Sequence, residues 1–207
     1  MIRVLLALAL LLPAPLLAQS YGQLPGLFRV TDVAPNDVLN IRAQPDASAP
    51  IVGVLPHDAT AVEVVYTDDT TKWGRVNSGE TGGWVSMRFL ARESDRMWSA
   101  ASTPLSCFGT EPFWNATVDF DPATLAFRWF DSPATELEIT WVHQPAGRIG
   151  GPLGLKLTGV DMTGFATIRE DMCNDGMSDR AFGLAVELFL EDGEGPQGYS
   201  GCCSLGH

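Results

Sequence analysis

The sequence is poor in basic residues, and this scarcity excludes one large class of partners. It holds 13 lysines and arginines against 25 aspartates and glutamates, which gives a formal charge of −12 and a pI near 4.5. A surface this acidic repels phosphate backbones and anionic lipids. We therefore expect no nucleic-acid partner.

Long apolar runs are also missing. The longest, residues 4–12, is followed by Pro13 and Pro15 and is too short for a membrane-spanning helix, which needs about 20 apolar residues. With Arg3 before it and Ala18 behind it, the run is typical of a secretory signal peptide, residues 1–18, cleaved after Ala18. No cysteine follows the run, which disfavours a lipid-anchored form. We expect a periplasmic or secreted protein without a membrane span.

Catalytic and cofactor motifs are lacking as well. The three histidines are scattered along the chain, so a hydrolytic triad is not indicated. The glycine-rich stretch 147–154 has neither the dinucleotide-binding nor the Walker spacing. Residues 198–201 do not form the G-x-S-x-G motif of a nucleophile elbow. We expect no cofactor and no metal.

What the sequence has in quantity is short alternating segments between turn residues. Hydrophobic residues make up 45% of the chain, enough for a packed core, and 21 glycines and 14 prolines favour many turns. Such segments predict a small all-β barrel in the N-terminal half. They cover residues 28–30, 38–42, 51–55, 61–65, 72–76 and 83–86.

Four of these segments carry a resemblance to a known family. In order they read VLNIRAQP at 38–45, IVGVL at 51–55, WGRV at 73–76 and GWV at 83–85. Residues 28–91 thereby resemble bacterial SH3 (SH3b) domains. The resemblance implies a five-stranded, barrel-like fold, and domains of this family often bind peptides or cell-wall peptidoglycan.

Three aromatic residues in this region are candidate ligand contacts. Trp73 and Trp84 lie within segments of alternating apolar and polar residues, and Tyr66 lies near them in sequence. Packing in or against the core is the common role of such tryptophans, and a platform for a ligand is the alternative.

The remaining chain divides by composition. Residues 19–27 are expected to be a loose leader, and residues 92–105, which are charged and then small and polar, a linker. Residues 106–207 are expected to form a second small antiparallel β-barrel or sandwich of six or seven strands. The strands are predicted at 113–120, 125–130, 135–142, 154–159, 164–170 and 182–190.

A second resemblance appears in this half. It is carried by CFGTEPFW at 107–114, CNDGMSDR at 173–180 and GCC at 201–203. These three motifs resemble a family of uncharacterised bacterial envelope and lipoprotein domains. The resemblance implies a location in the envelope and gives no mechanism.

Four cysteines, Cys107, Cys173, Cys202 and Cys203, allow three pairings. A bridge between the adjacent Cys202 and Cys203 is strained and rare. Two disulfides are expected, in which Cys107 and Cys173 each take one of the terminal pair. The alternative is a zinc site from Cys173, Cys202, Cys203 and His207, but the sequence has no C-x-x-C spacing, and an exported protein favours oxidation.

The run 171–180 is the densest stretch of polar functional groups. Its acids could form a calcium loop, but Cys173 and Phe182 occupy positions where that loop needs oxygen ligands. Alternatively, Asp179 and Arg180 could pair locally, while Asp175 or Ser178 turns the backbone through side-chain hydrogen bonds. The candidate binding residues of this half are Asp175, Ser178, Asp179 and Arg180 in this run and Glu111 in the 107–114 motif.

These observations favour an exported, non-enzymatic binding protein. Its SH3b domain would recognise a peptide, peptidoglycan or an envelope protein, and its second domain would have a role of unknown kind in the envelope. The alternative is an envelope enzyme, or an inhibitor of one, that acts through Glu111 and the 171–180 loop. That alternative requires these carboxylates to be partly buried, within hydrogen-bond reach of one another, in a pocket.

Overall fold

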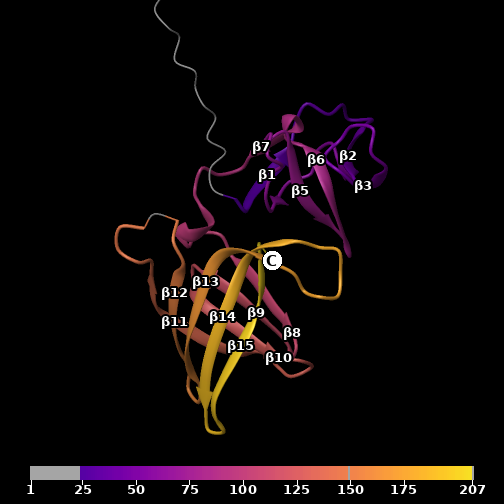
Figure 1. The fold of residues 1–207 in the computed structure, drawn as a ribbon. Coiled ribbons are helices and arrows are strands. Elements are labelled where there is room, and N and C mark those ends of the chain that lie inside the picture. Colours follow the sequence, from indigo (N-terminus) through magenta and orange to yellow (C-terminus); the bar gives the residue numbers. More distant parts are fainter. Residues whose placement is uncertain (1–23, 149, 207) are drawn as a thin grey trace, which may run out of the picture.

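The computed structural model describes residues 24–148 and 150–206 and is built from β-strands in two parts (Figure 1). The predicted signal peptide, residues 1–18, lies outside the described residues. Within these ranges, no helix is long and apolar enough to cross a membrane.

Two antiparallel sheets form the N-terminal part. The first has the strand order β4-β1-β7 and the second the order β3-β2-β6-β5. The elements are β1 (Gly26–Val30), β2 (Val38–Arg42), β3 (Ile51–Pro56), β4 (Val62–Val64), β5 (Trp73–Ser78), β6 (Thr81–Ser86), the 3-10 helix η1 (Met87–Phe89) and β7 (Leu90–Arg92). Alternate residues of the strands meet in one apolar core around Phe28, Ile41 and Val85.

The ends of this part differ from the sequence expectation. Strand β1 begins at Gly26, inside the segment expected to be a loose leader, and pairs with β4. Leu24 packs against the apolar core. In the segment expected to be a linker, the 3-10 helix η2 (Trp98–Ala100) places Trp98 in the core of the C-terminal part, with 2% of its surface exposed. Both segments therefore contribute apolar contacts.

The C-terminal part is a closed barrel, which decides between the barrel and the sandwich of the sequence analysis. Each strand pairs with the next along the chain, and β15 returns to pair with β8. The strands are β8 (Leu105–Thr110), β9 (Phe113–Phe120), β10 (Ala123–Trp129), β11 (Thr135–His143), β12 (Leu153–Thr158), β13 (Thr163–Cys173), β14 (Phe182–Asp192) and β15 (Gly195–Leu205). Its interior is filled by inward-facing side chains such as Leu137, Leu155 and Leu184, as in other barrels of this strand number.

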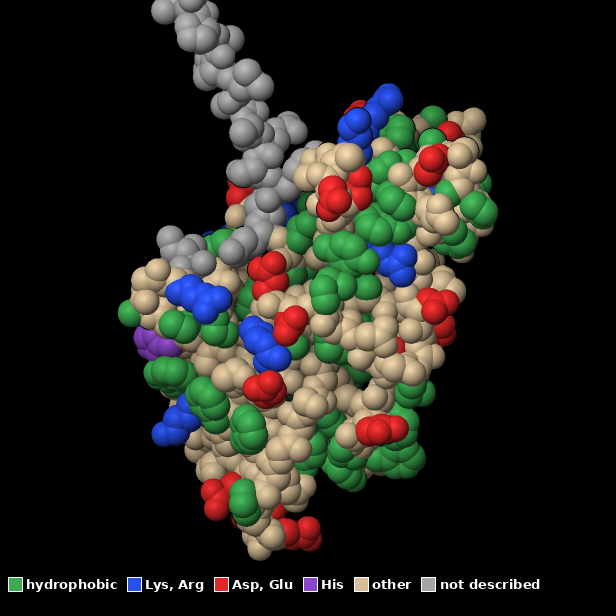
Figure 2. All heavy atoms as spheres, in the orientation of Figure 1, with side chains coloured by type: hydrophobic (Ala, Val, Ile, Leu, Met, Phe, Trp, Pro, Cys, Tyr) green, Lys and Arg blue, Asp and Glu red, His purple; other side chains and the backbone are tan. Residues whose placement is uncertain are grey.

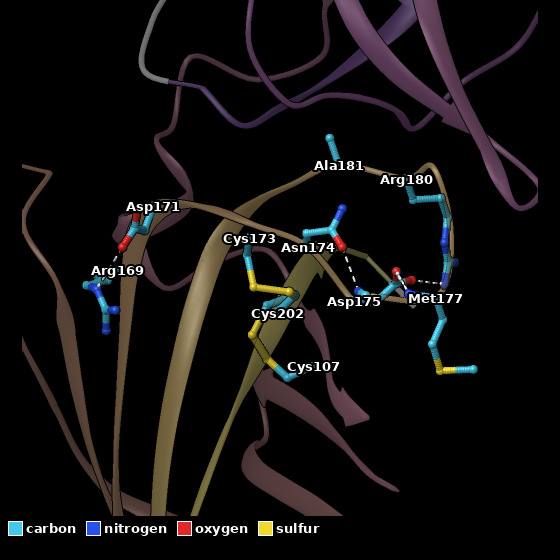
Figure 3. Close-up of a disulfide and its surroundings, with 12 residues drawn as sticks. Cys107, Arg169, Asp171, Cys173, Asn174, Asp175, Met177, Arg180, Ala181 and Cys202 are labelled. Atoms are coloured by element: carbon cyan, nitrogen blue, oxygen red, sulfur yellow. Dashed lines mark hydrogen bonds and ion pairs between the residues drawn. A yellow bond between two sulfur atoms is a disulfide. The ribbon is translucent and has the colours of Figure 1, made fainter. Parts of the chain in front are cut away.

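The two disulfides follow from the alternation of side chains along β15. Cys203 faces the barrel interior, where it is directly opposite Cys107 of β8 and bonded to it. Cys202 points to the other side of the sheet and is bonded to Cys173 at the end of β13 (Figure 3). This result confirms the expected disulfides and chooses between the two pairings. It also removes the thiolates that a zinc site would need.

Candidate functional site

The first candidate site is a groove beside Trp73 on the N-terminal part. Gly74 and Val76 of β5 are buried, so Trp73 points away from the core. The groove has a volume of about 510 Å³ and is also lined by the side chains of Phe89, Arg42, Asp32 and Asp37. It therefore combines two aromatic rings, one cation and two anions.

Arg42 is held in position within this groove. Its Nη1 donates a hydrogen bond of 2.9 Å to the carbonyl oxygen of Ala49. Ala49 lies in a turn that is closed by Asp46. The Asp46 carboxylate accepts bonds from the backbone N–H and the hydroxyl of Ser48, both at 2.7 Å. A positioned guanidinium is suited to carboxylate groups, which it can bind through two parallel hydrogen bonds.

Tyr66 and Trp84, the other two predicted aromatics, pack against each other. Their ring centroids are 5.5 Å apart in an edge-to-face arrangement, and the Arg75 guanidinium lies 6.0 Å from the Trp84 ring. Trp84 is directly opposite Arg42 in the pairing of β2 with β6, so it lies next to a residue that lines the Trp73 groove. Arg75 Nη2 also donates a bond of 3.0 Å to the carbonyl oxygen of Asp179, which links this pair of rings to the junction with the barrel.

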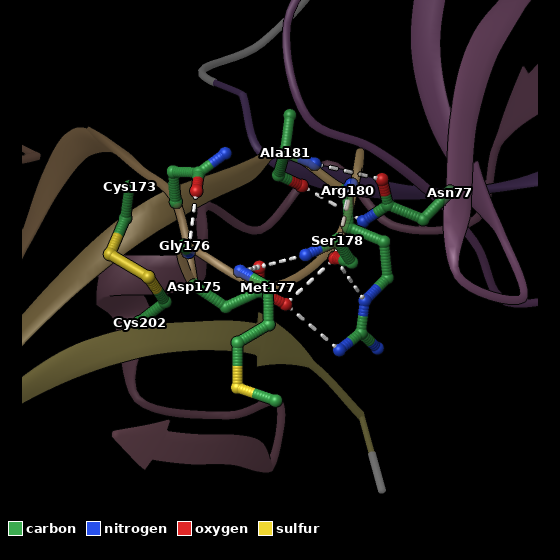
Figure 4. A network of polar contacts seen from close by, with 10 residues as sticks. Asn77, Cys173, Asp175, Gly176, Met177, Ser178, Arg180, Ala181 and Cys202 are labelled. Carbon is green, nitrogen blue, oxygen red and sulfur yellow. Dashed lines mark hydrogen bonds and ion pairs between the residues drawn. A yellow bond between two sulfur atoms is a disulfide. The ribbon is translucent and has the colours of Figure 1, made fainter. Parts of the chain in front are cut away.

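The second candidate site is the 174–181 loop, whose conformation depends on Asp175. This carboxylate is buried and accepts bonds from the backbone N–H groups of Met177 and Ser178 and from the Ser178 hydroxyl, at 3.0, 2.9 and 2.7 Å (Figure 4). Arg180 adds an ion pair of 3.2 Å. Burial by itself raises the pKa of Asp175, but these hydrogen bonds outweigh burial and lower the pKa to about 2.

The same loop is bound to the N-terminal part through its backbone (Figure 4). The Asn77 side chain donates to the carbonyl oxygen of Ala181 at 2.8 Å and accepts from the Ala181 N–H at 3.1 Å. The Asp179 N–H donates to the carbonyl oxygen of Glu80 at 3.2 Å. The loop is thus a clasp between the two parts of the molecule, with the Cys173–Cys202 disulfide at its base.

A cleft of about 430 Å³ lies between this loop and the barrel. Glu111 and Asp175 both line it, together with Arg169, Asp171 and Glu187. Glu111 is exposed, as is Asp179. Arg169 is bound to Glu187 at 2.8 Å and to Asp171 at 3.4 Å. Asp175 is turned toward its own loop.

This geometry does not provide what the enzymatic alternative requires. Two of its three carboxylates, Glu111 and Asp179, are exposed, and the third, Asp175, is committed to the loop. Among the described residues, no three histidine, cysteine, aspartate or glutamate side chains gather as a metal site. The loop holds its shape by local hydrogen bonds in which Asp175 turns the backbone, as one alternative from the sequence expects. The ion pair differs from that expectation, because Arg180 binds Asp175 and not Asp179.

Several contact residues were not foreseen from the sequence. Asn77 and Arg75 hold the clasp, and Arg42 and Phe89 line the groove. For Asn77, Arg75 and Arg42 the only signal is an outward position in an alternating strand, which many other polar residues share. Phe89 lies in the 3-10 helix η1 and has no such signal.

Comparison with known families agrees with the N-terminal part. Residues 37–91 match the family model of the bacterial SH3 domain. The curated proteins contain no match to the chain. The matched residues begin in the turn before β2 and end in β7, so they include Trp73, Arg42 and Phe89 of the groove. Over residues 37–91, the N-terminal part is therefore similar to a bacterial SH3 domain.

Proposed function

We propose that this protein is an exported, non-enzymatic binding protein whose SH3 domain recognises a peptide of the cell wall through the Trp73 groove. The observation that carries the proposal is the juxtaposition of aromatic and charged groups in one groove of this binding domain. Clefts that combine an apolar surface with a few placed polar groups are the usual form of a ligand site.

The charges of the groove fit a peptide that carries both free amino and free carboxyl groups. Arg42 offers a guanidinium for a carboxylate, and Asp32 and Asp37 offer carboxylates for an amine. Cell-wall stem peptides carry both kinds of group. Trp73 and Phe89 supply the apolar area that gives affinity.

A periplasmic or secreted location supports this function. Both disulfides require an oxidising compartment, and the predicted signal peptide leads to one. In such a compartment the barrel would hold the SH3 domain in place through the 174–181 loop, as an envelope component without a reaction of its own.

The test is retention of the full-length protein on purified peptidoglycan at low salt. We expect the wild type to be retained and to be eluted by a soluble stem tetrapeptide. Trp73→Ala should weaken retention about tenfold, because a central aromatic contact is worth more than about 1 kcal/mol. Trp73→Phe should keep most of the binding.

Trp129→Ala is the matched control, since Trp129 of the barrel is 41% exposed and far from the groove in sequence. It should be retained like the wild type. Failure of the wild type to bind at low salt would exclude the cell-wall function. Unchanged retention of Trp73→Ala would exclude the groove as the site.

A further inference from the structure

A row of aromatic side chains crosses the outer face of the barrel. The register of the sheet places one residue from each of five neighbouring strands side by side on this face. From β11 to β15 the row reads Trp141, Lys156, Phe165, Phe189 and Gly198. These residues are far apart in sequence, and the barrel alone brings them together.

The rings in this row are exposed to an unusual degree. The exposed fractions are 42% for Trp141, 40% for Phe165 and 54% for Phe189. The Trp141 and Phe165 ring centroids lie 6.2 Å apart. Figure 2 shows hydrophobic side chains standing on the barrel face formed by these strands. Contiguous exposed rings of this kind mark a binding surface more often than single exposed apolar residues do.

Glycines beneath the rings make room for them. A Cβ atom at Gly154 would lie 2.9 Å from a Trp141 ring atom and 3.2 Å from one of Phe165. A Cβ atom at Gly198 would meet the Phe189 ring at 3.4 Å. The rings thus pack against bare backbone, which restricts their motion and reduces the entropy that a ligand would have to remove.

Polar side chains border the row on both sides. The next outward-facing row toward one barrel end contains Thr158, Thr163 and Glu191. The next row toward the other end contains Thr167 and Glu187. Beside Phe165 and Phe189 the surface is hollowed by about 840 Å³. The surface is therefore a strip of aromatic rings, interrupted by Lys156, between two lines of hydrogen-bonding groups.

We propose that this row binds a neutral oligosaccharide chain laid across the strands. A sugar ring presents a face of C–H groups, which are slightly positive, and the face of an aromatic ring is slightly negative. The hydroxyl groups at the edges of the sugar would meet the threonine and glutamate side chains of the two bordering rows. The aromatic rings of the row thus match the C–H faces of the sugars, and the two bordering rows match their hydroxyl groups.

The charges of the surface argue against other occupants. On one side, Glu187 is bound to Arg169 at 2.8 Å. Lys156 and Glu191 line the hollow, and Glu138 lies opposite Thr158 in the same bordering row as Glu191, so the charges here sum to a negative value. No positive excess is left to hold a phosphate or an anionic lipid. A wholly apolar partner would cover the threonines and glutamates without offering them hydrogen bonds, which is unfavourable.

The length of the row fits an extended sugar chain. Neighbouring strands lie about 4.8 Å apart, so the row from Trp141 to Gly198 spans about 19 Å. One strand spacing is close to the length of one sugar ring in such a chain. The row therefore has room for about four sugars.

The experiment is calorimetric titration of the full-length protein with chitohexaose, a neutral N-acetylglucosamine hexamer. We expect the wild type to bind. Trp141→Ala and Phe189→Ala should each weaken binding about tenfold or more, as the loss of a central aromatic contact does. Phe189→Tyr should retain binding, since it keeps the ring.

Phe113→Ala is the matched control, because Phe113 is 49% exposed at another place on the barrel and should not affect binding. Trp73→Ala should bind chitohexaose like the wild type, so failure of the SH3 groove and failure of this row are distinguishable. The proposal is overturned if the wild type does not bind at millimolar sugar, or if both alanine variants bind unchanged. It is equally overturned if Phe189→Ala abolishes self-association in sedimentation or binding to phosphatidylcholine vesicles instead.

Discussion

Asp175 is the single side chain on which the shape of the 174–181 loop depends most. It accepts two backbone N–H bonds and one hydroxyl bond and pairs with Arg180. Its pKa in the folded protein is about 2, below its ordinary value of 3.8. The ionised form is therefore stabilised by folding. This contribution is complete above the ordinary pKa and is lost as the pH falls toward 2.

Asp175→Asn should lower the free energy of unfolding by about 1–3 kcal/mol at neutral pH, because buried donors lose a charged acceptor. Urea denaturation measures the loss, which should shrink as the pH is lowered from 3.8 to about 2. Asp171→Asn is the control. Asp171 is exposed and pairs with Arg169 at 3.4 Å, so its loss should stay below about 0.5 kcal/mol. Equal losses in the two variants would contradict the role of Asp175.

At the scale of elements, the last strand carries both covalent links of the barrel. Cys107–Cys203 joins β15 to β8, where the barrel closes, and spans 96 residues. Cys173–Cys202 joins β15 to the end of β13 and spans 29 residues. The longer link restricts the unfolded chain more.

Replacing Cys107 and Cys203 together by alanine should therefore cost about 4–5 kcal/mol of unfolding free energy. Replacing Cys173 and Cys202 should cost about 3–4 kcal/mol. Denaturant unfolding of the two double variants, with the wild type beside them, gives both values. A larger loss for Cys173 and Cys202 would show that the loop matters more to the fold than the closing seam of the barrel does.

The sequence predicts most strands and misses those without a clear pattern. Strands such as Ile51–Pro56 and Phe182–Asp192 are rich in apolar and β-branched residues, and they are found where they were expected. The strand Gly195–Leu205 contains three glycines and a proline, and its first residues resemble a polar turn. It is a strand because β14 and β8 pair with it on both sides.

The candidate sites were harder to foresee for a related reason. Tyr66 was expected near Trp73 and Trp84, and the structure packs it against Trp84. The groove at Trp73 also includes Arg42 and Phe89, which come from other elements of the fold. The aromatic row of the barrel depends on the register of five strands, which no local pattern specifies. Side-chain direction can be predicted within a strand, but neighbours across strands cannot.

At the scale of the whole molecule, Glu63 makes a second link between the two parts. Its carboxylate, on β4, accepts a bond of 3.2 Å from the backbone N–H of Leu205 at the end of β15. Burial raises the pKa of Glu63 to about 7, and the bond from Leu205 only partly offsets burial. The folded protein therefore keeps a proton here that the unfolded chain releases near its ordinary pKa of 4.5.

Stability should fall as the pH rises from 4.5 to about 7, because ionisation of Glu63 opposes folding in this window. Glu63→Gln keeps the acceptor and removes the ionisation. It should be more stable than the wild type above pH 7, by up to about 3 kcal/mol, and equal to it below pH 4.5. Thermal unfolding across this pH range measures the difference.

Glu93→Gln is the matched control, since Glu93 is exposed and also accepts a backbone bond, from Ala61 at 2.8 Å. It should leave the pH dependence of the wild type unchanged. If Glu63→Gln behaves in the same way, Glu63 does not hold a proton at the junction.

The hydrogen bonds of the clasp go to the main chain of the loop. Asn77, Arg75 and Glu80 bind the backbone groups of Asp179 and Ala181. The outward side chains of the loop, such as Met177 at 69% exposure, take no part in this attachment. Substitutions at these positions can therefore alter the chemistry of the loop surface while its place in the molecule stays the same. For protein engineering, this loop is a position where new side chains can be displayed from a fixed support.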